Sequence, residues 1–128
     1  MKNRFDLIIF DWDGTLADSV DWIVECLQYA AQQQNCALPT ATAAKDIIGL
    51  SIEHAVATLF PAADSETRIK LARDYSEKFF SRPPSRDDLF PGVPSMLEDF
   101  KASGYRLAVA TGKKATGLKQ IMAATGVE

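Results

Sequence analysis

Two carboxylates separated by one residue, then a glycine and a hydroxyl, form the part of this sequence best suited to chemistry. Asp11 and Asp13 follow an apolar run, and Gly14 and Thr15 come directly after them. On an extended chain, residues i and i+2 point to the same side. The glycine permits a turn that brings backbone N–H groups towards an anion. This combination suits phosphate chemistry, provided that a divalent cation offsets the repulsion between carboxylates and phosphate.

A structural interpretation competes with the chemical one. An Asp-Gly pair at the end of a strand is a common turn, in which both acids would be solvated side chains. A turn, however, needs neither two alternating acids nor the Thr15-Leu16 pair that follows. The chemical interpretation therefore explains more of the pattern.

Two short apolar runs predict the strands that position these groups. Residues 5–10 predict a strand that is buried on both faces, as parallel strands are, with the two acids at its carboxyl end. Residues 106–110 predict a second buried strand, which leads into Thr111, Gly112 and Lys113. Open α/β sheets bind their ligands at the carboxyl ends of the strands. We therefore expect both groups of residues at one edge of the sheet.

Helical periodicity fills most of the remaining sequence. Six helices are predicted, at about residues 20–34, 43–48, 52–60, 65–80, 94–101 and 115–124. Asp18 or Ser19 should cap the first helix, Ser65 should open the fourth, and Ile69 should face inward. Residues 81–88 contain adjacent prolines and no periodicity, which predicts a linker. The order of elements indicates an α/β unit interrupted by a helical insertion.

Composition narrows the class of protein. The chain has 128 residues, 47% of them hydrophobic and 24% charged, which is typical of a globular domain. The net charge of −3 argues against a nucleic-acid surface, which normally needs a basic face. No apolar run approaches the ~20 residues of a membrane-spanning helix. Cys26 and Cys36 lack metal-binding or redox spacing, and Cys26 is expected to be a small buried side chain. We expect a cytoplasmic protein that acts on a small molecule, with neither nucleic acid nor membrane as a partner.

Two segments resemble conserved motifs of one enzyme superfamily. Residues 7–16 resemble motif I of the haloacid dehalogenase superfamily, in which four apolar residues precede DxDG(T/V)(L/V). Residues 107–113 resemble motif II, an apolar strand that ends in Thr or Ser, and residues 89–104 resemble the run leading into it. Thr111 follows Asp11 by 100 positions (111 − 11). This interval is similar to that of the phosphoglycolate phosphatase-like subgroup, which carries a helical cap directly after motif I.

The resemblance implies a fold and a division into domains. The fold would be α/β, a partial Rossmann-like core of parallel strands with an inserted four-helix cap. The core would comprise residues 1–17 and 87–128 and would be incomplete, and the helical cap would comprise residues 18–86.

The resemblance also implies a mechanism. The protein would be a phosphatase that hydrolyses a small phosphorylated metabolite. Asp11 would attack the phosphorus to form an aspartyl-phosphate, and Asp13 would act as general acid and base. Both would also bind Mg²⁺. Phosphate would be bound by Gly14, Thr15, Thr111, Gly112 and Lys113.

Three further features have alternative interpretations. Residues 49–51 lie where the family often places a substrate-specificity loop, although a helix stop followed by an N-cap explains them equally well. Lys113 and Lys114 either contact phosphate or begin a solvated helix. His54, the only histidine, is expected at the surface.

The activity and assembly of the chain are open to alternatives. It could be a phosphomutase-like phosphotransferase, or a non-catalytic remnant that binds phosphate or a partner protein. The family also requires a lysine and an acidic Gly-Asp strand downstream of motif II, and the 128 residues hold neither. We therefore expect a truncated product with little phosphatase activity and weak Mg²⁺ binding. An exposed sheet edge would favour self-association.

Overall fold

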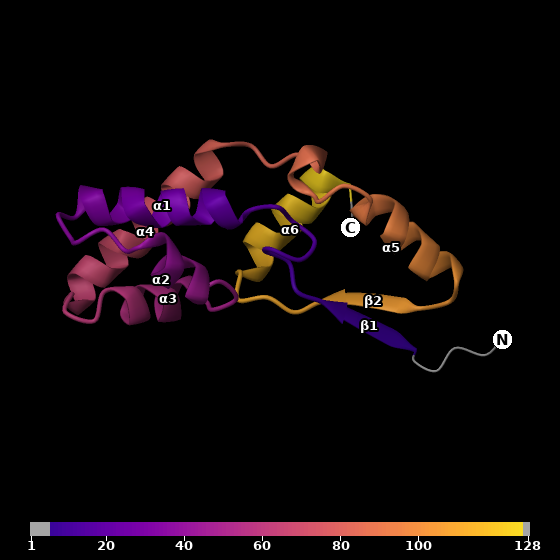
Figure 1. Cartoon of the computed structure of the whole chain (residues 1–128), viewed down its shortest axis with the longest axis horizontal. Helices are drawn as coiled ribbons and strands as arrows, with labels where there is room; N and C mark the ends of the chain where they lie inside the picture. Colours follow the sequence, from indigo (N-terminus) through magenta and orange to yellow (C-terminus); the bar gives the residue numbers. More distant parts are fainter. Residues whose placement is uncertain (1–5, 127–128) are drawn as a thin grey trace.

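The computed structural model describes residues 6–126 and contains two strands among its helices. The elements are β1 (Leu7–Phe10), α1 (Val20–Gln33), α2 (Ala41–Asp46), α3 (Ile52–Leu59), α4 (Ser65–Ser81), the 3-10 helix η1 (Arg86–Asp88), α5 (Val93–Ala102), β2 (Arg106–Val109) and α6 (Ala115–Thr125) (Figure 1). The predicted α/β class and order of the main elements are confirmed. The proposed start of the first strand at residue 5 lies outside the described residues.

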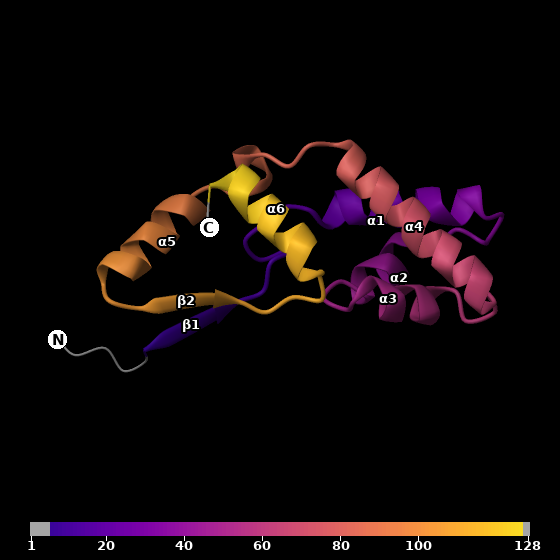
Figure 2. The same cartoon turned by 180° about the vertical axis from the view of Figure 1, so that it is seen from behind.

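The elements gather at two ends of an elongated molecule. Helices α1 to α4 pack together at one end, and β1, β2 and α5 lie at the other, with α6 between them (Figures 1 and 2). The helical stretch, residues 20–81, is thus spatially distinct from the strands that precede and follow it in the sequence.

The two strands form a parallel pair. Leu7 is opposite Arg106 and Phe10 is opposite Val109, so both strands end at the same edge. The ladder continues one residue beyond β2, where the Ala110 N–H donates to the Phe10 carbonyl over 2.8 Å. This register places the residues after β1 directly beside the residues after β2, as the sequence predicts.

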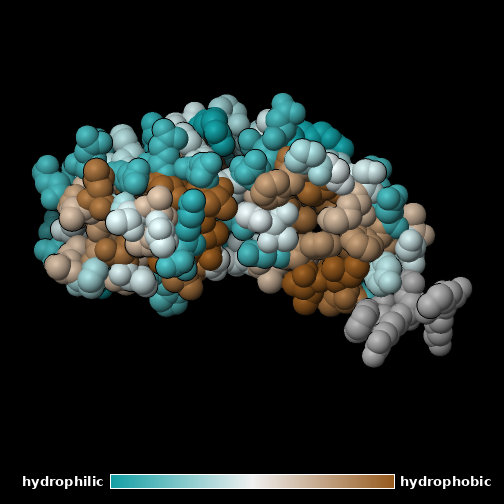
Figure 3. Space-filling view, in the orientation of Figure 1, coloured by the Kyte–Doolittle hydropathy of each residue, from teal (hydrophilic) through white to brown (hydrophobic). Residues whose placement is uncertain are grey.

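Burial of the strands on both faces is a prediction that proves wrong. Leu7 is 49% exposed and Ile9 is 60% exposed, while Ile8 and Phe10 are partly covered. In the orientation of Figure 1, hydrophobic surface is visible over the strands at the lower right (Figure 3). Within the described residues, β1 pairs only with β2 and α5 packs beside β2, so one face of β1 has no covering layer. Whether this surface promotes self-association stays a prediction.

The helical segment has its own apolar interior. Helix α1 packs against α4, with Leu27 at 1% and Leu71 at 0% exposure. Cys26 is fully buried, and burial raises the pKa of its thiol to about 12. The prediction that Cys26 is a small buried side chain is confirmed, and a thiol with a raised pKa is unreactive.

Two details between residues 65 and 88 differ from the predictions. Ile69 is 70% exposed, because α4 instead turns Leu71 and Asp74 inward. Asp74 is tolerated there since its carboxylate accepts a 2.7 Å hydrogen bond from Gln34 Nε2. Helix α4 begins at Ser65, as predicted, and the side chain of its N-cap Asp64 accepts from the Thr67 N–H. The predicted linker contains η1.

Backbone hydrogen bonds join the two segments that connect the helical segment to the strands. The Asp18 N–H donates to the Asp88 carbonyl over 2.7 Å, and the Phe90 N–H donates to the Leu16 carbonyl over 3.0 Å. The chain therefore leaves and re-enters the α/β part side by side. Among the described helices, none has the length and apolar character needed to cross a membrane.

Candidate functional site

The site begins with a tight turn at the end of β1. The Trp12 carbonyl accepts hydrogen bonds from the N–H groups of residues 15–17, and the Trp12 side chain is buried, with 1% exposure. Gly14 has a φ of +78°, a left-handed conformation that other residues rarely adopt. Its N–H donates to the Ala17 carbonyl over 2.8 Å. A glycine is therefore required here, but its N–H and that of Thr15 already bond within the turn.

Asp13 is held from two sides. The Ser19 hydroxyl donates to Asp13 Oδ1 over 2.7 Å, and Lys113 Nζ lies 3.3 Å from Asp13 Oδ2. The side chains of this ion pair are 10% exposed for Asp13 and 16% for Lys113. Ser19 occupies the N-cap position of α1 but makes no side-chain cap bond, because its hydroxyl bonds Asp13 instead. The start of α1 is thus tied to the acidic group of the site.

Asp11 lies in a more open setting. Its side chain is exposed, and Oδ1 accepts a 2.8 Å hydrogen bond from the Trp12 N–H. Thr15 is exposed as well. Asp11 and the Thr15 hydroxyl therefore remain accessible to a molecule that approaches the end of β1.

The loop after β2 supplies the other half of the site. The Lys113 N–H donates to Thr111 Oγ1 over 3.3 Å, which tightens the loop around Gly112. A β-carbon on Gly112 would lie 2.4 Å from the Leu50 carbonyl carbon and 2.6 Å from the Ser51 nitrogen. Only glycine permits so close an approach between this loop and the loop that joins α2 and α3.

A cavity of ≈ 190 Å³ lies between these two loops. The predicted site residues that line it are Asp13, Thr111, Gly112 and Lys113. Asp11, Gly14 and Thr15 are outside its lining, at the exposed turn. The loop at residues 49–51 also contributes to it, through Gly49 and Leu50.

Aromatic side chains of α4 form a wall that the sequence analysis missed. Tyr75, Phe79 and Phe80 all line the cavity, and Lys113 Nζ lies 4.4 Å from the centroid of the Phe79 ring. Burial, with a smaller contribution from the negative charge of Asp13, raises the pKa of Tyr75. Helical periodicity predicts Tyr75 and Phe79 as inward-facing, but it cannot distinguish a cavity wall from a packed core.

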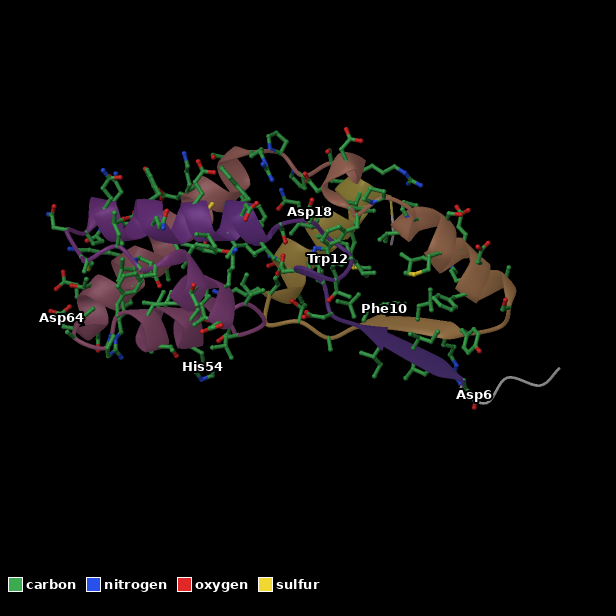
Figure 4. The ribbon with its side chains drawn as sticks, viewed as in Figure 1. Asp6, Phe10, Trp12, Asp18, His54 and Asp64 are labelled. Atoms are coloured by element: carbon green, nitrogen blue, oxygen red, sulfur yellow. The ribbon has the colours of Figure 1, made fainter. Side chains whose placement is uncertain are left out.

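Lys114 and His54 lie towards solvent. Lys114 Nζ is 3.6 Å from Glu53 in an ion pair whose side chains are 75% and 62% exposed. His54 is exposed on α3 and points away from the rest of the helical segment (Figure 4). The surface position predicted for His54 is confirmed.

The oxygen atoms at the turn after β1 are of the type that binds Mg²⁺ in proteins. Mg²⁺ prefers carboxylate and carbonyl oxygens and is commonly bound by one or two carboxylates, water and phosphate. Asp11 and Asp13 supply two carboxylates, and no hydrogen bond to the Asp13 carbonyl is present among the described residues. Residues 6–126 contain no cluster of three or more acidic, histidine or cysteine side chains that could hold a metal.

Comparison with known protein families agrees with this geometry. The model of the haloacid dehalogenase-like hydrolases matches residues 8–128, which include β1 from its second residue, all of β2 and the whole helical segment. The chain belongs to this family. The family assignment makes the chain a phosphatase-like hydrolase by descent, and members typically depend on Mg²⁺.

Individual relatives show the same relationship. The chain is 33% identical over 124 residues to "Probable phosphatase IndB" of Dickeya dadantii, and the matched region covers 94% of the chain and 54% of IndB. It is 32% identical over 123 residues to "Tyrosine-protein kinase PtkA" of Mycobacterium tuberculosis, and the matched region covers 95% of the chain and 41% of PtkA. The chain thus spans about half the length of these curated relatives.

A solved structure shows the shared fold. A protein described as a predicted phosphoglycolate phosphatase from Haemophilus somnus superposes with a TM-score of 0.76 at 24% identity. The match covers 98% of this chain and 59% of that one. The chain therefore has a phosphoglycolate phosphatase-like fold, of which it holds a partial α/β core.

Proposed function

We propose that the protein hydrolyses phosphate monoesters of small metabolites through an aspartyl-phosphate. The observation that carries this proposal is the arrangement at the strand ends. Asp13 after β1 and Thr111 and Lys113 after β2 line one cavity, next to the exposed carboxylate of Asp11. This arrangement supports the proposal, because α/β proteins bind ligands at the carboxyl edge of parallel strands.

Each residue has a role in the proposed reaction. The Asp11 carboxylate attacks phosphorus, the bond to the leaving oxygen breaks, and an aspartyl-phosphate forms. Asp13 gives a proton to the leaving oxygen and later takes one from the water that hydrolyses the intermediate. The hydroxyls of Thr15 and Thr111 and the ammonium of Lys113 bind phosphate oxygens.

Backbone groups have supporting roles in the same scheme. Gly112 offers its N–H to phosphate, while Gly14 forms the turn that holds Asp13 in place. Asp11 and Asp13 would hold Mg²⁺, which when bound offsets the negative charge of the carboxylates and the phosphate.

The proposed domain division follows the same plan. Residues 1–17 and 87–128 would form the α/β core that performs the chemistry, and residues 18–86 would form a cap over it. Because the chain spans about half the length of its relatives, turnover is proposed for the whole protein. Measurements of phosphate binding to this chain test its site independently of turnover.

Turnover of phenyl phosphate with Mg²⁺ tests the proposal. Asp11→Asn and Asp13→Asn should each abolish hydrolysis, because one loses the nucleophile and the other the proton donor. Asp18→Asn, a change at an exposed aspartate of the same segment, should retain it. Substantial activity in Asp11→Asn would contradict the assignment. Phosphate binding at Gly112 without turnover of any ester would instead favour a non-catalytic role.

A phosphotransferase is a second candidate, since one relative at 32% identity carries the name of a tyrosine kinase. The two reactions share the aspartyl-phosphate and differ in its acceptor, which is water for a phosphatase and a hydroxyl group for a transferase. Adding an alcohol acceptor such as glucose or a tyrosine peptide to the same assay distinguishes them. A phosphorylated acceptor, detected by mass spectrometry, would identify transfer.

A further inference from the structure

The two parts of the chain that line the cavity differ in chemistry. The turn after β1 and the loop after β2 provide polar groups, including Asp13, Thr111 and Lys113. Every residue that the helical segment contributes is uncharged, and most are apolar, among them Ile48, Leu50, Phe79 and Phe80. A phosphate ester bound at the polar end would thus place its leaving group against an apolar wall.

Both cations that line the cavity in the described residues already have acidic partners. Lys113 Nζ lies 3.3 Å from Asp13, and Lys114 Nζ lies 3.6 Å from Glu53. Lys113 belongs to the phosphate end in the proposed function. Because no lining residue of the helical segment is charged, the wall itself offers no cation to a second anionic group on the substrate, such as a carboxylate.

The size and composition of the wall favour a ring. The cavity measures ≈ 190 Å³, and an engineered apolar cavity of about 150 Å³ is known to bind benzene. Phe79 and Phe80 meet edge to face with centroids 5.1 Å apart, and Tyr75 stacks on Phe79 at 5.8 Å. Aromatic rings prefer such offset and edge-on partners.

We infer that the leaving group of the substrate is a single uncharged aromatic ring. This inference rests on the proposed phosphatase function and adds the substrate class. A carboxylate on the leaving group would lose hydration against Leu50 and Phe79, and the helical segment offers it no cation. A sugar would leave several hydroxyls unpaired, because the helical segment lines the cavity with only two polar side chains, Tyr75 and Ser76, and α6 adds only Thr116.

Two non-hydrolysable phosphonates test the inference by titration calorimetry on the full chain with Mg²⁺. Benzylphosphonate matches phenyl phosphate, and 3-phosphonopropionate matches an ester with a carboxylate on its leaving group. We expect benzylphosphonate to bind at least about tenfold more tightly, because only its ring suits an apolar wall. Equal affinities, or tighter binding of 3-phosphonopropionate, would overturn the inference.

A charge placed on the wall gives an independent check. Leu50 lines the cavity and is 47% exposed, so Leu50→Lys should fold and place an ammonium beside the leaving group. This variant should reverse the preference in favour of 3-phosphonopropionate. Ile69→Lys is the matched control, since Ile69 is 70% exposed and outside the cavity lining. An unchanged preference in Leu50→Lys would count against the inference, as would a reversal in Ile69→Lys.

Failure of the proposed function can be told apart from failure of this inference. Amide NMR shifts of Gly112 and Lys113 on addition of inorganic phosphate report the phosphate end alone. If phosphate shifts these amides and benzylphosphonate gains nothing from its ring, the ring site is refuted while the phosphate site stands. If the ring preference holds but the whole protein does not hydrolyse phenyl phosphate, the proposed hydrolysis is refuted and the binding specificity stands.

Discussion

The contact between Gly112 and the loop at residues 49–51 makes a quantitative prediction. In Gly112→Ala the new β-carbon would lie 2.4 Å from the Leu50 carbonyl carbon, whereas ordinary contacts begin near 3.4 Å. The loops would have to separate by about 1 Å (3.4 − 2.4). The neighbouring atoms belong to the backbone, so no change of rotamer relieves the overlap. Overpacking of this kind costs about 1–3 kcal/mol.

Thermal unfolding measures this cost. For a chain of this size, a loss of about 2 kcal/mol corresponds to a decrease in Tm of roughly 5–10 °C. Phosphate affinity at Gly112 should also decrease, because the loop after β2 is displaced from Asp13. Circular dichroism melts and titration with inorganic phosphate detect the two effects.

Gly117→Ala is the matched control for the same chemical change. A β-carbon there would lie 3.4 Å from Phe80 Cζ, which is ordinary contact, and Gly117 lies inside α6. Alanine favours a helix over glycine by about 0.5–1 kcal/mol, so this variant should be equally or more stable. If Gly112→Ala melts within about 1 °C of the wild type and binds phosphate normally, the close approach of the two loops is wrong.

The ion pairs and the buried tyrosine give two further predictions. Lys113→Met leaves Asp13, 10% exposed, without its cation and should cost about 1–3 kcal/mol in urea unfolding. Lys114→Met breaks an exposed pair and should cost less than about 1 kcal/mol; equal losses would contradict the difference in burial. Burial and the charge of Asp13 raise the pKa of Tyr75 in the folded state. The contribution of neutral Tyr75 to the free energy of unfolding is therefore complete below the pKa of an unfolded tyrosine, about 10. This contribution is lost as the pH rises above that value. Between about pH 9 and 11, the free energy of unfolding should therefore decrease less in Tyr75→Phe than in the wild type. An equal decrease in the two proteins would refute this prediction.

Local sequence patterns predict the elements well and their burial less well. The apolar run before Asp11 predicts a strand correctly, but the exposure of Leu7 and Ile9 depends on which layers cover the sheet. Periodicity likewise locates α4, yet Ile69 is exposed and Asp74 is buried. The Asp74 carboxylate has two partners, the adjacent Arg73 and Gln34 at the end of α1. Burial of a polar side chain depends on all its partners, and the contact with Gln34 joins segments that are far apart in the sequence.

The site shows the same division between local and long-range information. Parallel pairing of two strands with acids and Thr111 at their ends predicts that these groups meet, and the register of β1 and β2 agrees. The approach of Gly112 to Leu50 joins loops far apart in the sequence, and no spacing rule predicts it. The aromatic wall of α4 depends on how the helical segment lies against these loops, which is again a tertiary property.

The central claim, that Asp11 accepts the phosphoryl group, is tested most directly by fluorine NMR with beryllium fluoride. Beryllium fluoride bonds to a nucleophilic carboxylate and mimics an aspartyl-phosphate, so the measurement does not require turnover. With Mg²⁺ present, bound-fluoride resonances should be observed for the wild type and for Asp18→Asn, and should be absent for Asp11→Asn. Bound-fluoride resonances that persist in Asp11→Asn would contradict the claim.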